Sequence, residues 1–302
     1  MAHEIQIDEA VLTISMDYFC KKILSGTSSG KVILQYLNPD GTIAETQNIY
    51  SHKAPIYGID WAHPSFGDMF VSGDSQGILR GWTKLPNQTD YSLSFEQTLN
   101  SPITSLKFCP NEYGCSFAIS QSSGQVTVYT KKDPNSNFLA EQPYLAHNGG
   151  CTSVSWCPAI PPTSLLAPGI DSYNPKRLAT GGCDKCVCVW RHNGHLWECE
   201  HRLEHHTHWV RDVEWAPSFG MPGLRLASSS EDKSIVISTA LFANLKQWQT
   251  QKIMFEEIPW SVKWSETGTI LAVSLSTDKV HLLQEGVDGS WSLLKEIDRE
   301  ME

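Results

Sequence analysis

Short segments in which apolar and polar residues alternate recur along the whole chain. Strict alternation with many β-branched residues is typical of a β-strand, because successive side chains of a strand point to opposite faces. Polar tight turns such as Ser28-Ser29-Gly30 precede several of these segments and predict hairpins. The six copies of this alternating strand are 31–34, 77–82, 125–129, 186–190, 234–237 and 279–283.

A second pattern places an aromatic residue two positions after an apolar one, often with proline close behind. Its five clear copies end at Trp61, Phe108, Trp156, Trp215 and Trp264, and a degenerate first copy lies around 12–15. A further strand is expected to close each unit, at 43–50, 91–99, 137–145, 195–203, 247–255 and 291–297. The units recur roughly every 47 residues, close to the period of WD repeats.

Four strands per unit and six units predict an all-β protein with the architecture of a six-bladed WD40-type β-propeller. We expect one domain over 1–302, because no linker interrupts the repeat. The fourth unit contains an insertion at 159–175, between its first and second strands, which we expect to be a surface loop on one rim. The predicted blades are 9–50, 51–99, 100–146, 147–204, 205–255 and 256–298.

Charge and composition exclude several kinds of partner. The formal net charge of -10 opposes binding to a phosphate backbone or directly to anionic lipid. No run approaches the roughly 20 apolar residues of a transmembrane helix, and the chain start shows no secretory signal. Nine cysteines without such a signal predict reduced thiols in a cytosolic or nuclear protein.

Histidines precede three of the predicted inner strands and are the first candidates for chemistry. They are His52, His147 and His206. In the fourth unit Thr180, Asp184 and Trp190 occupy the positions of the Ser/Thr–His–Asp–Trp hydrogen-bond network of WD repeats. The same residue types could form a hydrolase triad of Thr180, His147 and Asp184. Recurrence in several blades favours the structural network, so we expect no enzyme activity.

Two other groups invite a functional interpretation. Cys183 and Cys186 form a Cys-x-x-Cys pair, but no second pair exists, so packing is favoured over a zinc site. Arg211 and Asp212 are adjacent in an inner strand, face opposite sides and are each expected to pair with a neighbouring blade. No phosphate-binding glycine loop is present, and we expect no metal and no cofactor.

Three segments resemble one particular family of WD-repeat proteins. They are 61–68, the pair 154–159 and 177–184 that flanks the insertion, and 208–218, and the C-terminal segments 271–274 and 287–291 agree as well. These are similar to the Sec-thirteen family, the small propeller subunit of the COPII outer coat, which is shared with the Y-shaped nuclear pore complex. The chain departs from the pattern in the first blade, which lacks its aromatic anchor, and at Ser238 and Leu283, where tryptophan is expected.

The resemblance implies an open propeller that an α-solenoid partner completes with a seventh blade. That partner would be the long coat subunit of COPII at the endoplasmic reticulum, a nucleoporin at the nuclear envelope, or both in turn. It implies a non-enzymatic scaffold that meets membranes only through its assembly. The six units use the chain to its end and leave only 3–8 over, so we expect that neither terminus completes the other terminus's blade.

Apolar residues of the first and last units are the expected partner-binding positions. They are Ile5, Ile7, Leu12, Ile14, Trp260, Val262, Val280 and Leu282. Two other classes of protein remain open at this point. One is a closed WD40 adaptor that presents peptides on its top face, and the other is a sister open propeller of the pore complex.

Overall fold

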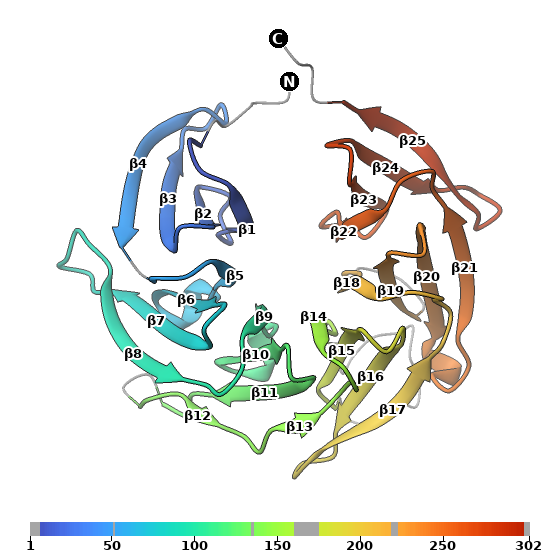
Figure 1. Ribbon diagram of the computed structural model, residues 1–302, viewed down its shortest axis with the longest axis horizontal. Helices are drawn as coiled ribbons and strands as arrows, with labels where there is room; N and C mark the ends of the chain where they lie inside the picture. Colours follow the sequence, from blue (N-terminus) through green and yellow to red (C-terminus); the bar gives the residue numbers. More distant parts are fainter. Residues whose placement is uncertain (1–6, 51, 134–135, 160–174, 219–222, 299–302) are drawn as a thin grey trace. The chain divides into compact units, whose positions relative to one another are not determined.

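Nearly all hydrogen-bonded strand pairs of the described residues join strands that follow one another in sequence (Figure 1). The structure is a computed structural model that describes residues 7–50, 52–133, 136–159, 175–218 and 223–298. The chain divides into two units, Met1–Pro143 and Tyr144–Glu302, and each contains three sheets. The fifteen-residue segment 160–174, most of the predicted insertion, lies outside the described residues.

The first unit holds three sheets. The first consists of β1 (Val11–Met16), β2 (Lys22–Thr27), β3 (Lys31–Leu37) and β4 (Ile43–Tyr50). The second consists of β5 (Ile56–Trp61), β6 (Asp68–Asp74), β7 (Ile78–Lys84) and β8 (Ser92–Thr98). The third contains β9 (Ile103–Phe108), β10 (Ser116–Gln121), β11 (Gln125–Thr130) and β12 (Leu139–Ala140).

The second unit begins with the short β13 (Tyr144–Leu145) and also holds three sheets. The fourth sheet consists of β14 (Cys151–Trp156), β15 (Arg177–Gly182), β16 (Val187–His192) and β17 (Trp197–Leu203). The fifth consists of β18 (Val210–Trp215), β19 (Gly223–Ser230), β20 (Ser234–Leu241) and β21 (Gln249–Met254). The sixth consists of β22 (Pro259–Trp264), β23 (Ile270–Leu275), β24 (Val280–Glu285) and β25 (Trp291–Ile297). Three 3-10 helices, η1 (Pro64–Phe66), η2 (Asn111–Tyr113) and η3 (Phe242–Asn244), complete the described elements. Within the described ranges, none of the helices is long and apolar enough to cross a membrane.

These sheets, five of four strands and one of five, confirm the predicted all-β architecture of a six-bladed WD40-type β-propeller, in which each sheet is one blade. Each blade uses strands that are consecutive in sequence. The predicted closing strand of the third unit, 137–145, is different in the structure: only β12 and β13 form, with three residues between them. Pro143 lies in that interval, and a proline cannot donate a hydrogen bond to a sheet ladder.

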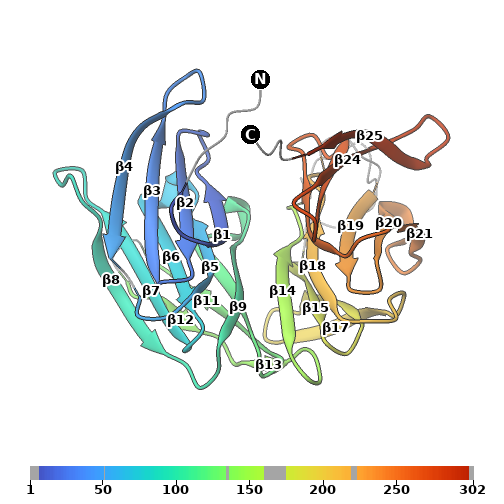
Figure 2. The same cartoon turned by 45° about the horizontal axis from the view of Figure 1, so that its top comes forward.

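Face-to-face packing of neighbouring blades forms the core of each unit. In the first unit, Leu24, Val32 and Leu34 of blade one are buried against Ile56 and Ile59 of blade two. The turned view of Figure 2 shows these two sheets, β1–β4 and β5–β8, next to each other. The second unit packs its blades in the same way, because one cluster joins β15 and β16 to β18 and another joins β19 and β20 to β22 and β23.

A carboxylate on the first strand of blade five also links the three blades of the second unit. Asp212 Oδ1 accepts a hydrogen bond from Ser153 Oγ of blade four at 2.7 Å. Its Oδ2 accepts from Ser261 Oγ at 2.7 Å and from the Val262 amide at 3.2 Å, both in blade six. Burial acts to raise the pKa of Asp212, but nearby Lys263 and these hydrogen bonds outweigh burial and hold the pKa below its ordinary value.

Asp60 has the corresponding role in the first unit. It accepts a hydrogen bond from Ser15 Oγ of blade one at 2.8 Å and from the Phe108 amide of blade three at 2.8 Å. Lys107 of blade three lies 3.7 Å from the same carboxylate. The middle blade of each unit therefore supplies one acidic group that is hydrogen-bonded to the blades on both sides.

We expect Asp212→Ala to lower the free energy of unfolding by about 3 kcal/mol, because two seryl groups and a buried amide would lose their acceptor. Urea denaturation measures this change. Asp90→Ala is the matched control, since Asp90 is exposed and accepts only surface hydrogen bonds, from Gln47 and Thr89. It should change stability by less than about 0.5 kcal/mol. Equal effects of the two substitutions would contradict the linking role of Asp212.

Candidate interaction site

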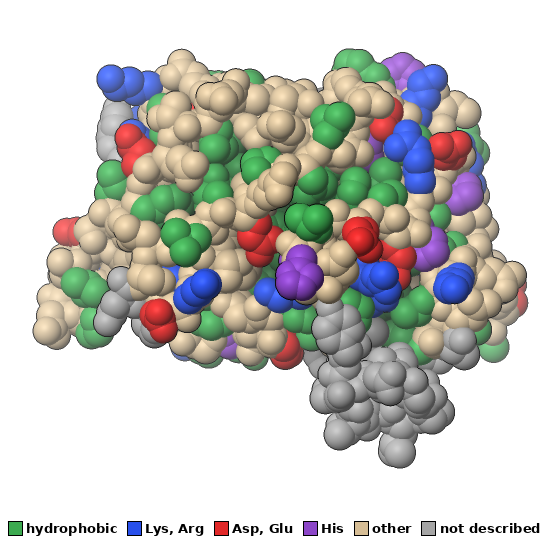
Figure 3. Space-filling model, turned by 90° about the horizontal axis from the view of Figure 1, so that it is seen from below, with side chains coloured by type: hydrophobic (Ala, Val, Ile, Leu, Met, Phe, Trp, Pro, Cys, Tyr) green, Lys and Arg blue, Asp and Glu red, His purple; other side chains and the backbone are tan. Residues whose placement is uncertain are grey.

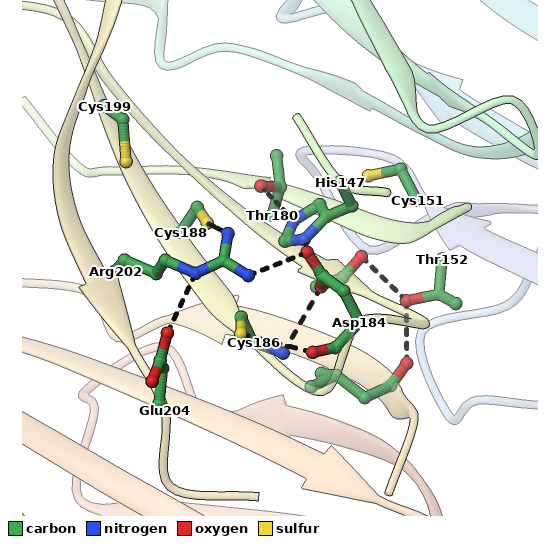
Figure 4. A network of polar contacts seen from close by, with 12 residues as sticks. His147, Cys151, Thr152, Thr180, Asp184, Cys186, Cys188, Cys199, Arg202 and Glu204 are labelled. Atoms are coloured by element: carbon green, nitrogen blue, oxygen red, sulfur yellow. Dashed lines mark hydrogen bonds and ion pairs between the residues drawn. The ribbon is translucent and has the colours of Figure 1, made fainter. Parts of the chain in front are cut away.

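A buried chain of hydrogen bonds fixes the entry to blade four (Figure 4). The His147 ring lies 2.7 Å from Asp184 Oδ1 through Nδ1 and 2.7 Å from Thr180 Oγ1 through Nε2. Trp190 Nε1 donates to the same threonine hydroxyl at 3.0 Å. A neutral imidazole protonated on Nδ1 satisfies every partner, since Thr180 then donates to Nε2 and Nδ1 donates to Asp184.

Blades two and five contain the same kind of network. His52 lies 2.9 Å from Asp74 and 2.7 Å from Ser72, which also accepts from Trp82 at 3.0 Å. In blade five His206 lies 2.8 Å from Ser228 Oγ and 3.3 Å from Asp232. The histidines were predicted from the sequence but Asp74 and Asp232 were not, although each follows its serine by two to four residues as Asp184 follows Thr180.

The geometry of these networks suits a structural role. Thr180 has no exposed surface, and its hydroxyl already accepts the indole proton of Trp190. Burial lowers the pKa of His147 and outweighs the opposing effect of Asp184, so the ring stays neutral near pH 7. A buried polar group whose partners are all present rigidifies its surroundings.

Arg202 borders this network on its outer side. Its guanidinium donates to Asp184 at 3.0 Å and to Glu204 at 3.0 Å, and it approaches Cys188 Sγ at 3.8 Å (Figure 4). All nine cysteines are free thiols. Across the described part of the chain, no three His, Cys, Asp or Glu side chains are grouped as a metal site requires.

Blade one differs from its neighbours at the corresponding positions. Ile7 precedes β1 by four residues, as His52 precedes β5. The pairing register places Ser25 and Gln35 where blade two has Ser72 and Trp82. Ser25 Oγ and Gln35 Oε1 are buried and have no hydrogen-bond partner among the described residues. Blade one therefore keeps part of the polar set without the histidine that would satisfy it.

The first strand of blade one is also exposed where other first strands are buried. Ile14 pairs with Ser25 as Ile59 pairs with Ser72 and Val213 with Ser228, so the three occupy one structural position. Ile59 and Val213 pack on the preceding blade of their unit and are each 1% exposed. Ile14 has this position in the first blade of the chain and is 61% exposed.

The neighbouring positions of β1 behave in the same way. Val11 is 38% exposed, whereas the equivalent Ile56 is fully buried. Met16 is 50% exposed where blade two has the buried Trp61. Farther out on this face, Ile23 has little exposed surface. We call the exposed part, Val11, Ile14 and Met16, the β1 face.

Blade six has an incompletely covered face on the opposite side. Val280 and Leu282 pair with Ser274 and Ala272, as Ile235 and Ile237 pair with Ser229 and Ala227 in blade five. That position is buried in blade five, where blade six packs against it. In blade six itself, Ala272, Val280 and Leu282 are only half-buried. We call these three residues the β24 face.

The structure distributes the eight predicted partner-binding residues over different environments. Ile14 belongs to the β1 face, and Val280 and Leu282 belong to the β24 face. Leu12 and Trp260 are exposed. Tyr57 has the same position in the first strand of blade two and is exposed as well, so exposure there does not distinguish the first and last blades. Ile7 is half-buried, and Ile5 lies outside the described residues.

Val262 is placed differently from the prediction. It is fully buried in the cluster that joins blades five and six, because its side chain points back toward β20. It therefore contributes to the core and not to an exposed surface. Val11, Met16 and Ala272 were not predicted from the sequence, since alternation alone does not tell which of two apolar faces is left exposed.

Arg211 links blades five and six on the exposed side of the first strands. Its guanidinium lies 4.4 Å from the ring centre of Trp260 and 5.7 Å from that of Trp209, and it pairs with Glu231. Both expected pairings are therefore present: Asp212 contacts the blades on each side, and Arg211 contacts blade six through Trp260.

These features define the class of protein as a WD-repeat β-propeller, and the model of the WD domain, G-beta repeat, matches residues 197–237. The chain is 34% identical over 301 residues to the Protein SEC13 homolog of Drosophila melanogaster, covering 96% of this chain and 80% of the relative. It is 32% identical over 303 residues to the Protein transport protein sec13 of Emericella nidulans, covering 96% of each. A protein of the same name from Aspergillus clavatus is 31% identical, with 94% of this chain and 98% of the relative covered. The chain belongs to the SEC13 family, which confirms the resemblance seen in the sequence.

We expect the free energy of unfolding to fall as the pH decreases from about 7.5 to about 5.5. Burial lowers the pKa of His52, His147 and His206 in the folded protein, so the unfolded chain binds protons that the folded chain does not. The contribution of these neutral rings to the free energy of unfolding is fully present above the pKa of histidine in the unfolded chain, about 6.5. Below that pH the contribution is lost, by at most about 1.4 kcal/mol per pH unit for each ring.

Denaturation of His147→Leu over the same pH range tests this assignment. The variant should be less stable than the wild type at pH 7.5, but its stability should decline less steeply toward pH 5.5. His195→Leu, at an exposed turn position, is the control and should keep the wild-type slope. The same slope in His147→Leu as in the wild type would show that His147 is not a buried neutral ring.

Proposed function

We propose that the protein is a non-catalytic scaffold subunit whose propeller is completed by a blade from an α-solenoid partner. That partner is a large subunit of the COPII coat cage, which acts in transport from the endoplasmic reticulum to the Golgi, or a nucleoporin of the nuclear pore Y complex. The protein could also serve both assemblies, with a different partner in each. The single observation that carries the proposal is the 61% exposure of Ile14 at a position that packing buries in the blades that follow.

The two incompletely covered faces support blade addition over other modes of binding. The β1 face belongs to the first blade of the chain and the β24 face to the last, and apolar side chains of both faces keep solvent-exposed surface. A blade of the partner would cover the β1 face in the way that Leu24, Val32 and Leu34 of blade one cover Ile56 and Ile59 of β5. Burying each aliphatic side chain stabilises such a complex by roughly 1.5–3 kcal/mol.

Two further observations fit a protein scaffold. The names of the fungal relatives describe protein transport proteins. On the face drawn in Figure 3, basic side chains lie among acidic ones instead of forming a continuous track, in keeping with the net charge of -10. We therefore propose that contact with membranes is made by the assembly and that nucleic acid is not a direct partner.

A stiff joint is the mechanical role of such a subunit. Asp60 and Asp212 each join three blades, and buried networks fix the entries to blades two, four and five. A partner segment packed between rigid sheets would transmit bending loads through the propeller. That property suits a lattice that holds a membrane in a curved shape.

Ile14→Asp should weaken binding of the solenoid partner at least a hundredfold, because a carboxylate would be buried against apolar side chains of the added blade. Isothermal titration of the purified proteins measures this. The side chain is mostly exposed in the free protein, so the variant should keep its thermal midpoint within a few degrees.

Leu93→Asp is the matched control for this substitution. Leu93 is a comparably exposed leucine on β8, on neither of the two faces, and its replacement should leave affinity unchanged. Tight binding by Ile14→Asp would refute the placement of the partner on the β1 face.

Affinity purification of the tagged protein from its own cells tests the class of function. We expect a large α-solenoid protein in one-to-one amount, and its identity as a coat subunit, a nucleoporin or both assigns the assembly. Recovery instead of many proteins that share a short peptide motif, with no solenoid, would support the closed adaptor. In that case the exposed Trp209 and Trp260 would be the residues to substitute first.

A further inference from the structure

Side chains of one blade accept hydrogen bonds from main-chain amides of the next blade. In blade six, the Val262 amide donates to Asp212 Oδ2 at 3.2 Å, and the Trp264 amide donates to Glu214 Oε2 at 2.7 Å. Both acceptors lie on β18, the first strand of blade five, and both donors lie on β22, the first strand of blade six. Acceptors two residues apart therefore meet amides two residues apart.

The joint between blades four and five is built in the same way with hydroxyl acceptors. The Val213 amide lies 3.3 Å from Ser153 Oγ, and the Trp215 amide donates to Ser155 Oγ at 3.1 Å. These serines lie two residues apart on β14, the first strand of blade four. The same spacing thus recurs with different side chains.

The first unit contains one joint of this kind and one exception. Asp60 of blade two accepts from the Phe108 amide of blade three at 2.8 Å. Between blades one and two the arrangement is different, because Ser15 Oγ donates to the Asp60 carboxylate. An acceptor on the preceding first strand is therefore found at three of the four joints within the units.

The first strand of blade one has two amides at the same positions. By strand register, Ile14 and Met16 of β1 correspond to the two donors of β22. The Asp17 amide donates to the Lys22 carbonyl of β2, and successive amides of a strand point to opposite sides. The amides of Ile14 and Met16 therefore point away from β2, toward the edge at which this sheet ends. Neither has an acceptor among the described residues of the first unit.

A hydroxyl lies next to the first of these amides. Thr13 has in β1 the position of Ser261 in β22. Ser261 Oγ donates to Asp212 Oδ2 at 2.7 Å, so one carboxylate oxygen accepts from this hydroxyl and from the Val262 amide. The Thr13 hydroxyl and the Ile14 amide are the equivalent pair of donors in blade one.

The residue at this position distinguishes the two kinds of acceptor. Where the acceptor is Ser153, blade five has an acid, Asp212, at the position of Thr13, and the serine hydroxyl donates to it at 2.7 Å. Where the acceptor is Asp212, blade six has the hydroxyl of Ser261. Blade one has a hydroxyl, so a carboxylate is the acceptor that fits it.

We propose that the first strand of the partner's blade carries an Asp or Glu whose carboxylate accepts from the Thr13 hydroxyl and the Ile14 amide. A second acceptor, two residues farther along that strand, accepts from the Met16 amide. Apolar packing alone would bury these donors without partners, at a cost for each. This inference rests on the proposed function and adds the polar chemistry of the blade that the partner supplies.

Thr13→Val tests the hydroxyl, because valine keeps the shape of threonine and cannot donate. With the intact solenoid partner recovered from the cells, isothermal titration should show about tenfold to hundredfold weaker binding, since a buried carboxylate loses a donor. Thr13→Ser keeps the hydroxyl and is the matched control, with an affinity within about threefold of the wild type. Unchanged affinity of Thr13→Val, together with loss of binding by Ile14→Asp, would overturn the inference and leave the proposed function intact.

A double-mutant cycle identifies the acceptor on the partner. Each Asp or Glu in the partner segment that this protein protects from proteolysis is replaced by Asn or Gln, and affinity is measured for the wild type and for Thr13→Val. One replacement should weaken binding to the wild type about tenfold and have a smaller effect on Thr13→Val. Additive effects at every acidic position would overturn the inference. If no solenoid partner is recovered, or if Ile14→Asp binds normally, the proposed function fails and the inference fails with it.

Discussion

Apolar side chains occupy both faces of the sheets in this protein, so each sheet needs a neighbour on both sides if its hydrocarbon is to be removed from water. Inside each unit the chain meets this requirement by itself. Ile56 and Ile59 cover blade one, and Val262 covers blade five, with almost no residual exposure. In the first and last blades of the chain this requirement is not fully met, and there Ile14 and Leu282 retain solvent-exposed surface. The β1 face and the β24 face are therefore exposed because of where their blades lie in the chain, and not because their residues have any special chemistry.

The blades differ in how many buried polar contacts supplement this apolar packing. Blades two, four and five carry a histidine four residues before their first strand, and each ring finds a hydroxyl and a carboxylate. Blades three and six have Leu99 and Phe255 at that point, and both pack against the apolar cores. Blade one is intermediate, since Ser25 and Gln35 keep polar atoms that none of the described residues satisfies. The entry to a blade can therefore be held by a histidine hydrogen-bond network or by an apolar side chain. In the first blade the polar network lacks its histidine and the apolar β1 face is exposed.

Much of the architecture could be predicted from the sequence because strand alternation and the tryptophan and histidine positions are local signals. The six blades and their register follow from them, as does the link between Thr180 and Trp190. What alternation cannot provide is the identity of the neighbour across a face. Val262 and Ile14 share one position in their strands, yet one is buried and the other is mostly exposed. The bridging roles of Asp60 and Asp212 were only partly predictable, because each depends on residues 45 to 60 positions away.

Each unit of the protein contains one bridging carboxylate, Asp60 in the first and Asp212 in the second. Asp60 has all of its partners among blades one to three, and the hydrogen-bonded partners of Asp212 on other strands lie in blades four and six. A break in one set leaves the other set whole. Each carboxylate therefore holds together the three blades of its own unit, so that those three blades carry a load as one mechanical module.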